Sequence, residues 1–445
     1  MSIAAENDRD GSTDWWGMSH APPEAIEGYT TQTSVVAGDA LELCVSTRPV
    51  ARYATRVYRL GWYRGAGARL LATLPGNIGL VRHAPPPDPE SGIVRASWPV
   101  TDVVMTDEDW PSGQYVAVLA LTTGPHAGAA SYVPFVLRTV PDDRPPILLQ
   151  MPVNTTQAYN HWGGKCLYDS NSTDHVAAVK VSFDRPVLSW RAANLNARAP
   201  FVYELPLIRW LEREGFEIGY QTDVDTHRDP SSLVGRRLLI TAGHDEYWTR
   251  EMRDGFDEAL ARGVSLAFMG ANTCYWQCRY EDQERTIVEY RHVSRDPHPD
   301  HALKTVRWRD LRPPRPERDL IGQQYGGGIL KPRDVRAFRF LPEFAVDRWA
   351  EGVELDVDHQ LERLVGYEWD TVDERHLPPG CVRILRCEDV PVPADCIRWT
   401  APSGSRVFSA GSLGLVWGLD DWASRGSADA RLQRVLAQGL REMVS

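Results

Sequence analysis

The stretch RRLLITAGHDEYWTREMRDGFDEALARGVSLAFMG, residues 236–270, decides the fold of this chain. It contains two short runs of almost continuous apolar residues, LLITA and SLAFM, and between them the segment TREMRDGFDEALARG places apolar residues at helical spacing. Apolar strands separated by amphipathic helices are typical of a parallel sheet that helices cover on both faces. We therefore expect an α/β fold that binds ligands beyond the carboxyl ends of its strands.

The same alternation continues on both sides of this stretch. Upstream lie ILLQMPV (147–153), the amphipathic segment YELPLIRWLEREG (203–215) and the run FEIGYQT (216–222). Downstream, strand character returns in RVFSAGSLGLVWGLD (406–420), before the closing helical segment SADARLQRVLAQGLREMV (427–444). We predict an α/β domain over residues 143–445 with a mainly parallel sheet, of Rossmann-like or glutamine-amidotransferase-like type.

Residues 28–142 have a different pattern, in which short β segments alternate with Gly, Pro and Asp turns. The expected strands are TTQTSVV, ALELCVST, TRVYRLGWY, IVRASWPV, GQYVAVLALT and SYVPFVLRTV. Several of them alternate apolar and polar residues, as half-buried antiparallel strands do. We predict a β-sandwich of immunoglobulin-like size. The Pro-rich segment VPDDRPP (140–146) ends this domain, and an N-terminal tail, residues 1–27, precedes it.

Composition limits the class of protein. A chain of 445 residues exceeds the roughly 250–300 residues of a single core, so two domains are expected. The net charge of −11 and the lack of a Lys/Arg block argue against nucleic-acid and anionic-membrane partners. The sequence shows neither a leader nor a long apolar run, and its seven cysteines lack CxxC spacing, so we expect a cytoplasmic protein with reduced thiols.

Three polar segments follow predicted strands and are candidates for the functional site. The first, GHDEYW (243–248), places a histidine, two carboxylates and a tyrosine between a strand and a helix. It lacks both the HExxH spacing of helical zinc sites and the Pro-Cys-x-x-Cys partner of zinc deaminases. An alternative interpretation is an Asp/Glu cap for the helix that starts near Thr249, beside a hydrogen-bonded histidine.

The second segment, TTQAYNHWGGKCLYDSNS (155–172), has polar residues, two glycines and two tyrosines where a helix is expected directly after a strand. Gly163 and Gly164 permit backbone conformations that other residues avoid. Such a loop could turn Tyr159 and Tyr168 toward a common point. Alternatively, both rings simply pack, with their hydroxyls hydrogen-bonded.

The third segment, GANTCYW (270–276), could form a sharp elbow at the sheet edge. Asn272 could orient a substrate carbonyl or stabilise an oxyanion, whereas Cys274 could act as a thiolate nucleophile. A nucleophilic cysteine needs a histidine or another positive neighbour. The flanking aromatic residues supply neither, so an inert, packed Cys274 is the simpler interpretation.

Together and in this order, the three segments resemble the large subunit of N,N-dimethylformamidase and its wider family. VYRLGWYRGAGARLL (57–71) and WPSGQYVA (110–117) are similar to that family's N-terminal β-domain. The resemblance spans about residues 28–425. A series of separate motifs in a fixed order is more specific than any one of them.

The resemblance implies a mononuclear ferric ion, Fe(III), in an enzyme that hydrolyses the C–N bond of a small amide. Matched by motif, Tyr159 in TQAYN and Glu246 in HDE correspond to two of the metal ligands. Tyr168 in LYD corresponds to the third ligand, and Tyr203 in VYELPLIRWLE is the reserve candidate for it. Three anionic oxygens suit a hard trivalent cation.

The resemblance also implies roles around the metal. His244 would hydrogen-bond to a ligand, Glu368 in GYEWD would act as acid and base, and Asn272 would contact the substrate. The expected pocket is lined by Thr155, Arg291 and Phe408. Thr155 stands where the family has a serine and Arg291 where it has a lysine, so the substrate could differ. Glu368 could alternatively form a structural ion pair with Arg291, and His244 could be a satisfied buried histidine.

Two other functions stay open: a thiol-dependent, amidotransferase-like hydrolase that uses Cys274 with His244, and a ligand-binding relative without activity. Besides the small-molecule amide, partners are undecided, because no segment can be assigned to a small subunit. Residues 290–345, rich in Arg, Pro, Asp and His, read as an excursion over the surface. That excursion could be a lid or a contact in a homo-oligomer.

Overall fold

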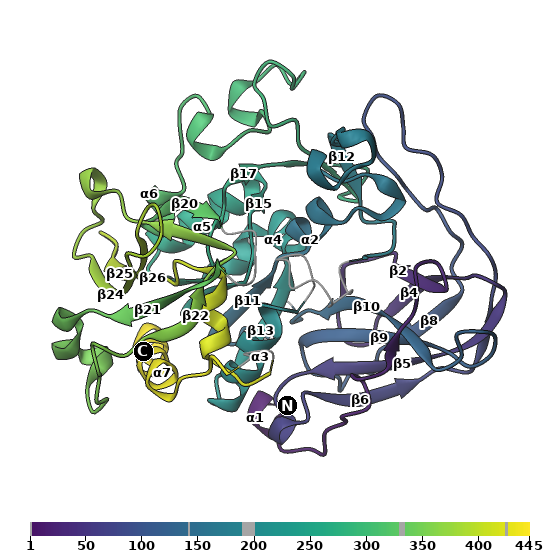
Figure 1. Ribbon diagram of the computed structural model, residues 1–445, viewed down its shortest axis with the longest axis horizontal. Helices are drawn as coiled ribbons and strands as arrows, with labels where there is room; N and C mark the ends of the chain where they lie inside the picture. The colour runs from purple at the N-terminus through teal and green to yellow at the C-terminus, as the bar shows by residue number, and fades with distance from the viewer. Residues whose placement is uncertain (1, 141–142, 189–200, 329–333, 423–425) are drawn as a thin grey trace.

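The computed structural model describes residues 2–140, 143–188, 201–328, 334–422 and 426–445. Figure 1 shows two β-rich regions beside each other, one built from the first third of the chain and the other a mixed sheet with its helices. None of the helices in these ranges combines the length and the apolarity that a membrane span requires.

The first region consists of two facing sheets. One has the strand order β1-β10-β9-β5-β6, with β3 paired to β10 and β7 paired to β5. The other has the order β2-β4-β8. The bounds are β1 (Ser19–His20), β2 (Ile26–Thr30), β3 (Ser34–Val35), β4 (Ala40–Thr47), β5 (Ala51–Leu60), β6 (Ala68–Thr73), β7 (Asn77–Gly79), β8 (Asp102–Met105), β9 (Gly113–Leu121) and β10 (Ala129–Leu137). Leu43, Val57 and Leu119 belong to the apolar core that the two sheets enclose. The prediction of paired, mainly antiparallel sheets is confirmed.

Two sequence expectations for this region were wrong. The segment IVRASWPV, residues 93–100, joins no strand ladder. Apolar and polar residues alternate in this segment because the side chains of Val94, Ala96 and Trp98 are buried on one side of it, in a cluster with Trp162. The expected tail is not a free extension either, because α1 (Ile3–Asn7) is partly buried and its first amide donates to Glu217 at 3.1 Å.

The second region contains a nine-stranded sheet in the order β13-β11-β14-β16-β26-β25-β24-β21-β22. The bounds are β11 (Ile147–Met151), β13 (Ile218–Thr222), β14 (Leu238–Ala242), β16 (Ser265–Met269), β21 (Arg336–Phe340), β22 (Leu361–Val365), β24 (Val382–Cys387), β25 (Ala394–Thr400) and β26 (Arg406–Ser409). The strands from β13 to β26 run parallel, and the remaining pairings are antiparallel. The sheet is therefore mixed rather than mainly parallel, since β25 and its neighbours β24 and β26 are antiparallel and joined by short loops.

Helices cover both faces of this sheet. Their bounds are α2 (Val153–Tyr159), α3 (Glu204–Arg213), α4 (Asp223–Arg228), α5 (Arg250–Ala261), α6 (Arg318–Ile321) and α7 (Ala430–Val444). Leu149 and Ile240 share a core with α3 and α7, whereas their neighbours Leu148 and Leu239 share another with α5. Both faces of the parallel strands β11, β13, β14 and β16 are buried, which explains their continuous apolar runs.

Small sheets and loops build up the rim above the strand ends. They comprise β12 (Lys180–Ser182) with β18 (Arg279–Glu281) and β19 (Thr286–Val288), β15 (Tyr247–Trp248) with β17 (Trp276–Gln277), and β20 (Gln324–Gly328) with β23 (Glu368–Thr371). The expected surface excursion, residues 290–345, is in part a core element. Trp308, Leu320 and Ile321 from it are buried in the core around α5.

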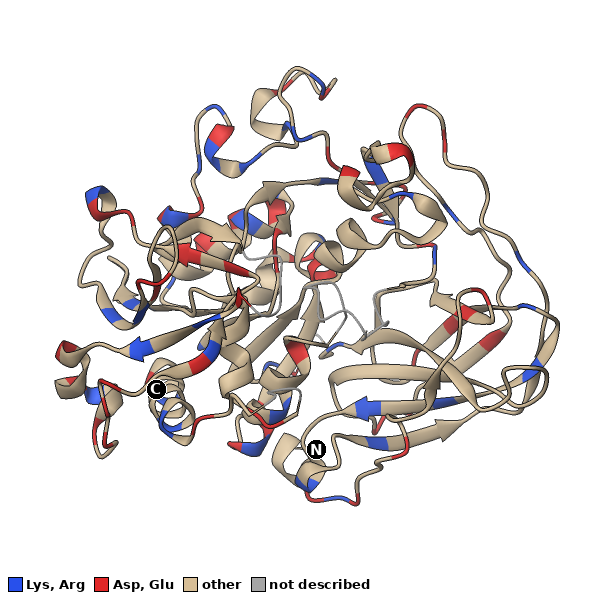
Figure 2. Ribbon diagram, in the orientation of Figure 1, with Lys and Arg blue, Asp and Glu red and all other residues tan. Residues whose placement is uncertain are grey.

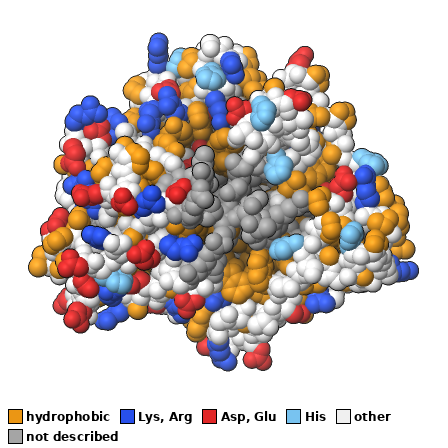
Figure 3. All heavy atoms as spheres, viewed as in Figure 1, with side chains coloured by type: hydrophobic (Ala, Val, Ile, Leu, Met, Phe, Trp, Pro, Cys, Tyr) orange, Lys and Arg blue, Asp and Glu red, His pale blue; other side chains and the backbone are white. Residues whose placement is uncertain are grey.

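Charges are mixed along the chain. Figure 2 shows acidic and basic residues scattered over both regions of the ribbon. On the face drawn in Figure 3, the described Lys/Arg and Asp/Glu side chains lie among one another. The described part of that face therefore carries no broad patch of one sign.

Candidate functional site

Two tyrosines and one glutamate converge above the carboxyl ends of the neighbouring strands β11 and β14. Tyr159 ends α2, which follows β11, and Glu246 lies just beyond β14. The hydroxyl of Tyr159 is 2.9 Å from Oε2 of Glu246. The hydroxyl of Tyr168 is 3.0 Å from Oε1 and 2.9 Å from Oε2 of the same carboxylate. The two rings stack with centroids 4.2 Å apart, so both phenols reach one carboxylate.

A short helix, rather than a loop, presents the first tyrosine. The sequence led us to expect no helix directly after β11, but α2 forms over Val153–Tyr159 and ends at Asn160. Gly163 and Gly164 then adopt φ of +73° and +88°. The chain turns back, and the amide of Leu167 donates to the carbonyl of Ala158 at 3.0 Å. This reversal brings Tyr168 beside Tyr159.

Two glycines allow the strand-end turns to approach each other. A Cβ on Gly270, after β16, would lie 1.9 Å from the carbonyl oxygen of Gly243, after β14. Gly243 itself has φ of +57°, and its Cβ would lie 2.7 Å from that of Tyr203. Both positions therefore require glycine, and the close approach sets the His244 and Asn272 turns side by side.

Neighbouring residues fix the position of Glu246. Its backbone amide donates to the Thr155 hydroxyl at 2.9 Å, so Thr155 anchors the turn. Asp245 is buried and accepts from Gln150 at 2.7 Å and from the Trp248 indole at 2.8 Å. The helix cap that we considered for Asp245 or Glu246 is supplied instead by Thr249, whose hydroxyl accepts from the amide of Met252.

His244, Glu368 and Asn272 form the other half of the cluster. Nε2 of His244 lies 3.0 Å from Oε2 of Glu368 and 3.4 Å from Oε2 of Glu246. The side-chain amide of Asn272 donates to Oε2 of Glu368 at 2.8 Å. Asn272 has φ of +54°, and its backbone amide is fixed by Asp370 at 2.9 Å. The structure therefore brings three of the expected site residues together, with Glu368 in contact with both His244 and Asn272.

Arg291 faces the tyrosines. Its guanidinium carbon lies 3.9 Å from the centroid of the Tyr168 ring, and the group also donates to the hydroxyl of Tyr247. Tyr247 in turn donates to the Tyr168 hydroxyl at 2.8 Å. From the sequence, Tyr247 was given no role of its own in the site. Its place within GHDEYW, one residue after Glu246, was the available signal.

Three other candidates lie apart from the carboxylate of Glu246. The Tyr203 ring stacks on Trp417 with centroids 5.5 Å apart, and its hydroxyl lacks a hydrogen-bond partner among the described residues. Phe408 is fully buried in β26, with its ring 5.9 Å from that of Trp349. Cys274 is buried in the core around α5, and its sulfur is 3.5 Å from Arg253. Burial raises the pKa of its thiol to about 12, which opposes thiolate chemistry.

The site gathers acidic side chains, namely the phenols of Tyr159 and Tyr168 and the carboxylates of Glu246 and Glu368. Burial, followed by the charge of Glu246, raises the pKa of Tyr159 and of Tyr168 well above their ordinary value. Burial also raises the pKa of Glu246. For His244 burial lowers the pKa, but the charges of Glu368 and Glu246 outweigh it and raise the value to about 9. A cation between these oxygens would relieve the crowding and favour the phenolates.

The donor set decides which metal could bind. In the described part of the chain, no three His, Cys, Asp or Glu side chains gather closely enough to hold a metal ion. A metal at this place would therefore rely on the phenols of Tyr159 and Tyr168 together with Glu246. Such hard oxygen donors fit a hard cation and not a soft one.

Comparison with known proteins now gives the family. The sequence family described as N,N-dimethylformamidase beta subunit-like, C-terminal, matches residues 54–429. The chain belongs to this family. That N,N-dimethylformamidase-like match includes the tyrosine, His-Asp-Glu and Asn272 segments and most of the strands of the first region.

Two curated relatives show the same likeness over a shorter stretch. They are the N,N-dimethylformamidase beta subunits of Alcaligenes sp and Paracoccus aminophilus, each 26% identical over 151 residues. The match covers 33% of this N,N-dimethylformamidase-like chain and 19% of each relative, so the chain matches about a fifth of their length.

Proposed function

We propose that this chain is an amide hydrolase that holds one ferric ion through Tyr159, Tyr168 and Glu246 and cleaves the C–N bond of a small amide. The observation that carries the proposal is the convergence of both phenol oxygens on one carboxylate, at 2.9 to 3.0 Å. Family membership supports an amide as the substrate.

The charges of these ligands fit ferric iron. Two phenolates and one carboxylate carry three negative charges, which match a trivalent hard cation. The phenols are neutral without a cation because burial raises their pKa. The field of a trivalent ion would remove their protons, as metal ions do to coordinating groups.

Residues beside the ligands could handle the protons of hydrolysis. The ion, when bound, would polarise the amide carbonyl and lower the pKa of a water molecule. Glu368 would accept the proton of the attacking water and deliver it to the departing nitrogen, which leaves poorly unless protonated. His244, whose Nε2 lies 3.0 Å from Oε2 of Glu368, would hydrogen-bond to that carboxylate and orient it. Asn272 would hold the Glu368 carboxylate in place through its 2.8 Å hydrogen bond.

Metal analysis and visible spectroscopy of the purified protein test this proposal. We expect about one iron per chain, as the three-oxygen ligand set holds a single ion, a visible tyrosinate-to-iron charge-transfer band, and release of amine from a small formamide. Protein without a stoichiometric metal would contradict the proposal. Iron with its band but no amidase activity would favour a ligand-binding relative.

The family also supports finer assignments. We propose that residues 28–142 form an immunoglobulin-like sandwich domain and that residues 143–445 form a glutamine-amidotransferase-like catalytic domain. All seven cysteines are free, which fits a reducing compartment, so we place the protein in the cytoplasm. The relatives are named beta subunits, and we propose that this chain also works in an oligomer, which light scattering would detect.

A further inference from the structure

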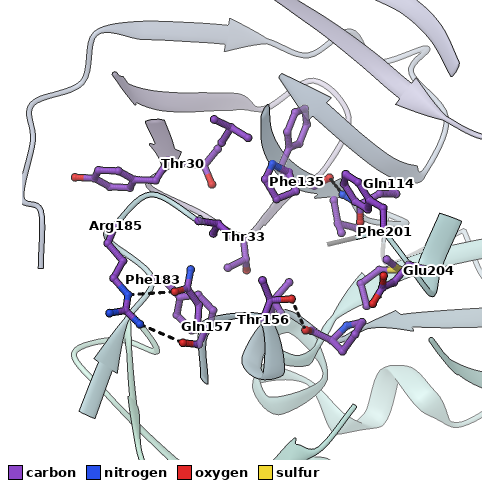
Figure 4. A pocket seen from close by; sticks show the side chains of 18 of the residues that line it. Thr30, Thr33, Gln114, Phe135, Thr156, Gln157, Phe183, Arg185, Phe201 and Glu204 are labelled. Atoms are coloured by element: carbon purple, nitrogen blue, oxygen red, sulfur yellow. Dashed lines mark hydrogen bonds between the residues drawn. The ribbon is translucent and has the colours of Figure 1, made fainter. Parts of the chain in front are cut away.

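One buried arginine joins the two segments that carry the tyrosines. Arg185 lies just beyond β12 and is fully buried. Figure 4 shows its guanidinium beside Gln157 of α2. Its acceptors are the side-chain oxygen of Gln157 at 3.3 Å and the carbonyl oxygens of Gln157 at 3.1 Å, Asn160 at 2.8 Å, Trp162 at 3.4 Å and Lys165 at 2.9 Å.

These acceptors explain why an arginine is needed at this place. The last carbonyls of a helix have no partner within the helix, and a cation near them also complements the helix dipole. Asn160, where α2 ends, supplies such a carbonyl, and Gln157 supplies one that also accepts from the Asn160 amide at 3.2 Å. Trp162 and Lys165 lie in the turn that leads to Tyr168, where the backbone joins no strand. The planar guanidinium group carries five N–H donors, so one arginine side chain can reach the carbonyls at the end of α2 and those of the turn at once.

Folding stability alone does not account for this buried charge. Arg59, a second fully buried arginine, pairs with Glu212 at 2.6 Å. Among the described residues, the acceptors of Arg185 are all carbonyl or amide oxygens, and burial lowers its pKa to about 10. Burying a cation without a carboxylate partner costs stability. We therefore assign the hydrogen bonds of Arg185 to fixing the conformation of this loop.

We propose that Arg185 is a positioning residue of the metal centre: it clamps the end of α2 to the following turn and so sets the separation of the Tyr159 and Tyr168 hydroxyls. The role rests on the proposed function only in that the two phenols are ligands. The hold on the loop itself exists without a metal, and it can be measured separately.

The test compares R185K with R59K, which alters a buried arginine elsewhere. Lysine keeps the charge but loses the fork. In metal-free protein, trypsin should cut after Lys165 faster in R185K than in the wild type or in R59K. On loading, R185K should bind iron about 10- to 100-fold more weakly, the usual effect of losing a group that orients a ligand, and its charge-transfer band should move. R59K should lose thermal stability while it retains wild-type iron affinity and band position.

Each outcome decides the point. Wild-type cleavage after Lys165 in R185K would contradict the clamp, and an unmoved band with wild-type iron affinity would contradict its effect on the phenols, so either result overturns the proposal. If the wild-type protein binds no iron, the proposed function fails, and the cleavage rate alone decides whether Arg185 holds the loop. If R185K does not fold, R185Q takes its place in both measurements.

Discussion

At the scale of single residues, Glu246 is the group on which the proposed metal centre depends. Both phenols contact its carboxylate, and Thr155 fixes its backbone. Glu246→Gln keeps the shape but removes one of three negative charges, so we expect iron content to fall to background while the melting temperature changes little. Metal analysis of the purified variant checks this. Full iron loading in the variant would exclude Glu246 as a ligand.

In the proposed iron-bound site, Arg291 should tune the Tyr168 phenolate. Its guanidinium carbon is 3.9 Å from the Tyr168 ring centroid, and a positive charge there stabilises the phenolate electrons. In Arg291→Met these electrons rise in energy, so the charge-transfer band should move to longer wavelength. Arg291→Lys, which retains the charge, should move it less. An identical band in the wild type and the methionine variant would show that Arg291 acts elsewhere.

The residues that sequence could locate follow short, almost continuous apolar runs. Tyr159 and Glu246 stand just beyond predicted strands, where ligands of α/β sheets bind. Tyr247 and Arg185 could not be assigned in this way. Their roles depend on contacts with Tyr168 and with the carbonyls of a turn, and neither contact leaves a periodic pattern in the sequence.

At the scale of elements, the parallel strands could be predicted because both of their faces are buried. β14 and β16 read as continuous apolar runs, and α5 has a regular amphipathic spacing. β24 contains arginines and is buried less evenly, so the antiparallel half of the sheet escaped prediction. The false strand at residues 93–100 shows the converse, since alternation reports one-sided burial and not pairing.

The contact between the β14 and β16 turns allows a prediction. In Gly270→Ala the added Cβ would lie 1.9 Å from the carbonyl oxygen of Gly243, so the turns must separate. We expect a loss of about 1–3 kcal/mol in the free energy of unfolding, as overpacking usually costs, together with weaker iron binding. Gly76→Ala, where the nearest atom is 3.6 Å away, is the matched control. Urea denaturation measures both, and equal stabilities would contradict the close approach.

Asp296 anchors the segment that carries Arg291. It accepts from Arg279 at 2.7 Å and from the Thr305 amide at 2.6 Å. Burial raises its pKa, but these hydrogen bonds outweigh burial and hold the pKa below its ordinary value. Because the folded-state pKa is depressed, the stabilisation is present above the unfolded pKa of about 3.9 and is lost as pH falls through the folded value.

Asp296→Asn should therefore cost about 1.5–3 kcal/mol near pH 7, the usual loss for hydrogen bonds to a charged group. The difference from the wild type should shrink as the pH falls toward 3. Urea denaturation at several pH values measures it, with Asp310→Asn, which breaks a more exposed pair with Arg307, as the control. A difference that does not change with pH would contradict the assigned ionisation of Asp296.

At the scale of the whole molecule, buried polar contacts join the two β-rich regions. Arg59 of β5 pairs with Glu212 of α3, and Tyr220 of β13 donates to the same carboxylate at 2.8 Å. Arg59 and Glu212 lie 153 positions apart in the sequence. No sequence pattern predicts such a contact. The two regions could be predicted separately, but the joint between them could not.

The central claim is that one ferric ion lies between Tyr159, Tyr168 and Glu246. An anomalous-scattering map from a crystal of the iron-loaded protein, collected on both sides of the iron absorption edge, tests it most directly. We predict one peak in contact with the two phenol oxygens and the carboxylate. A map without a peak there, or with its only iron peak bound to other residues, would contradict the account.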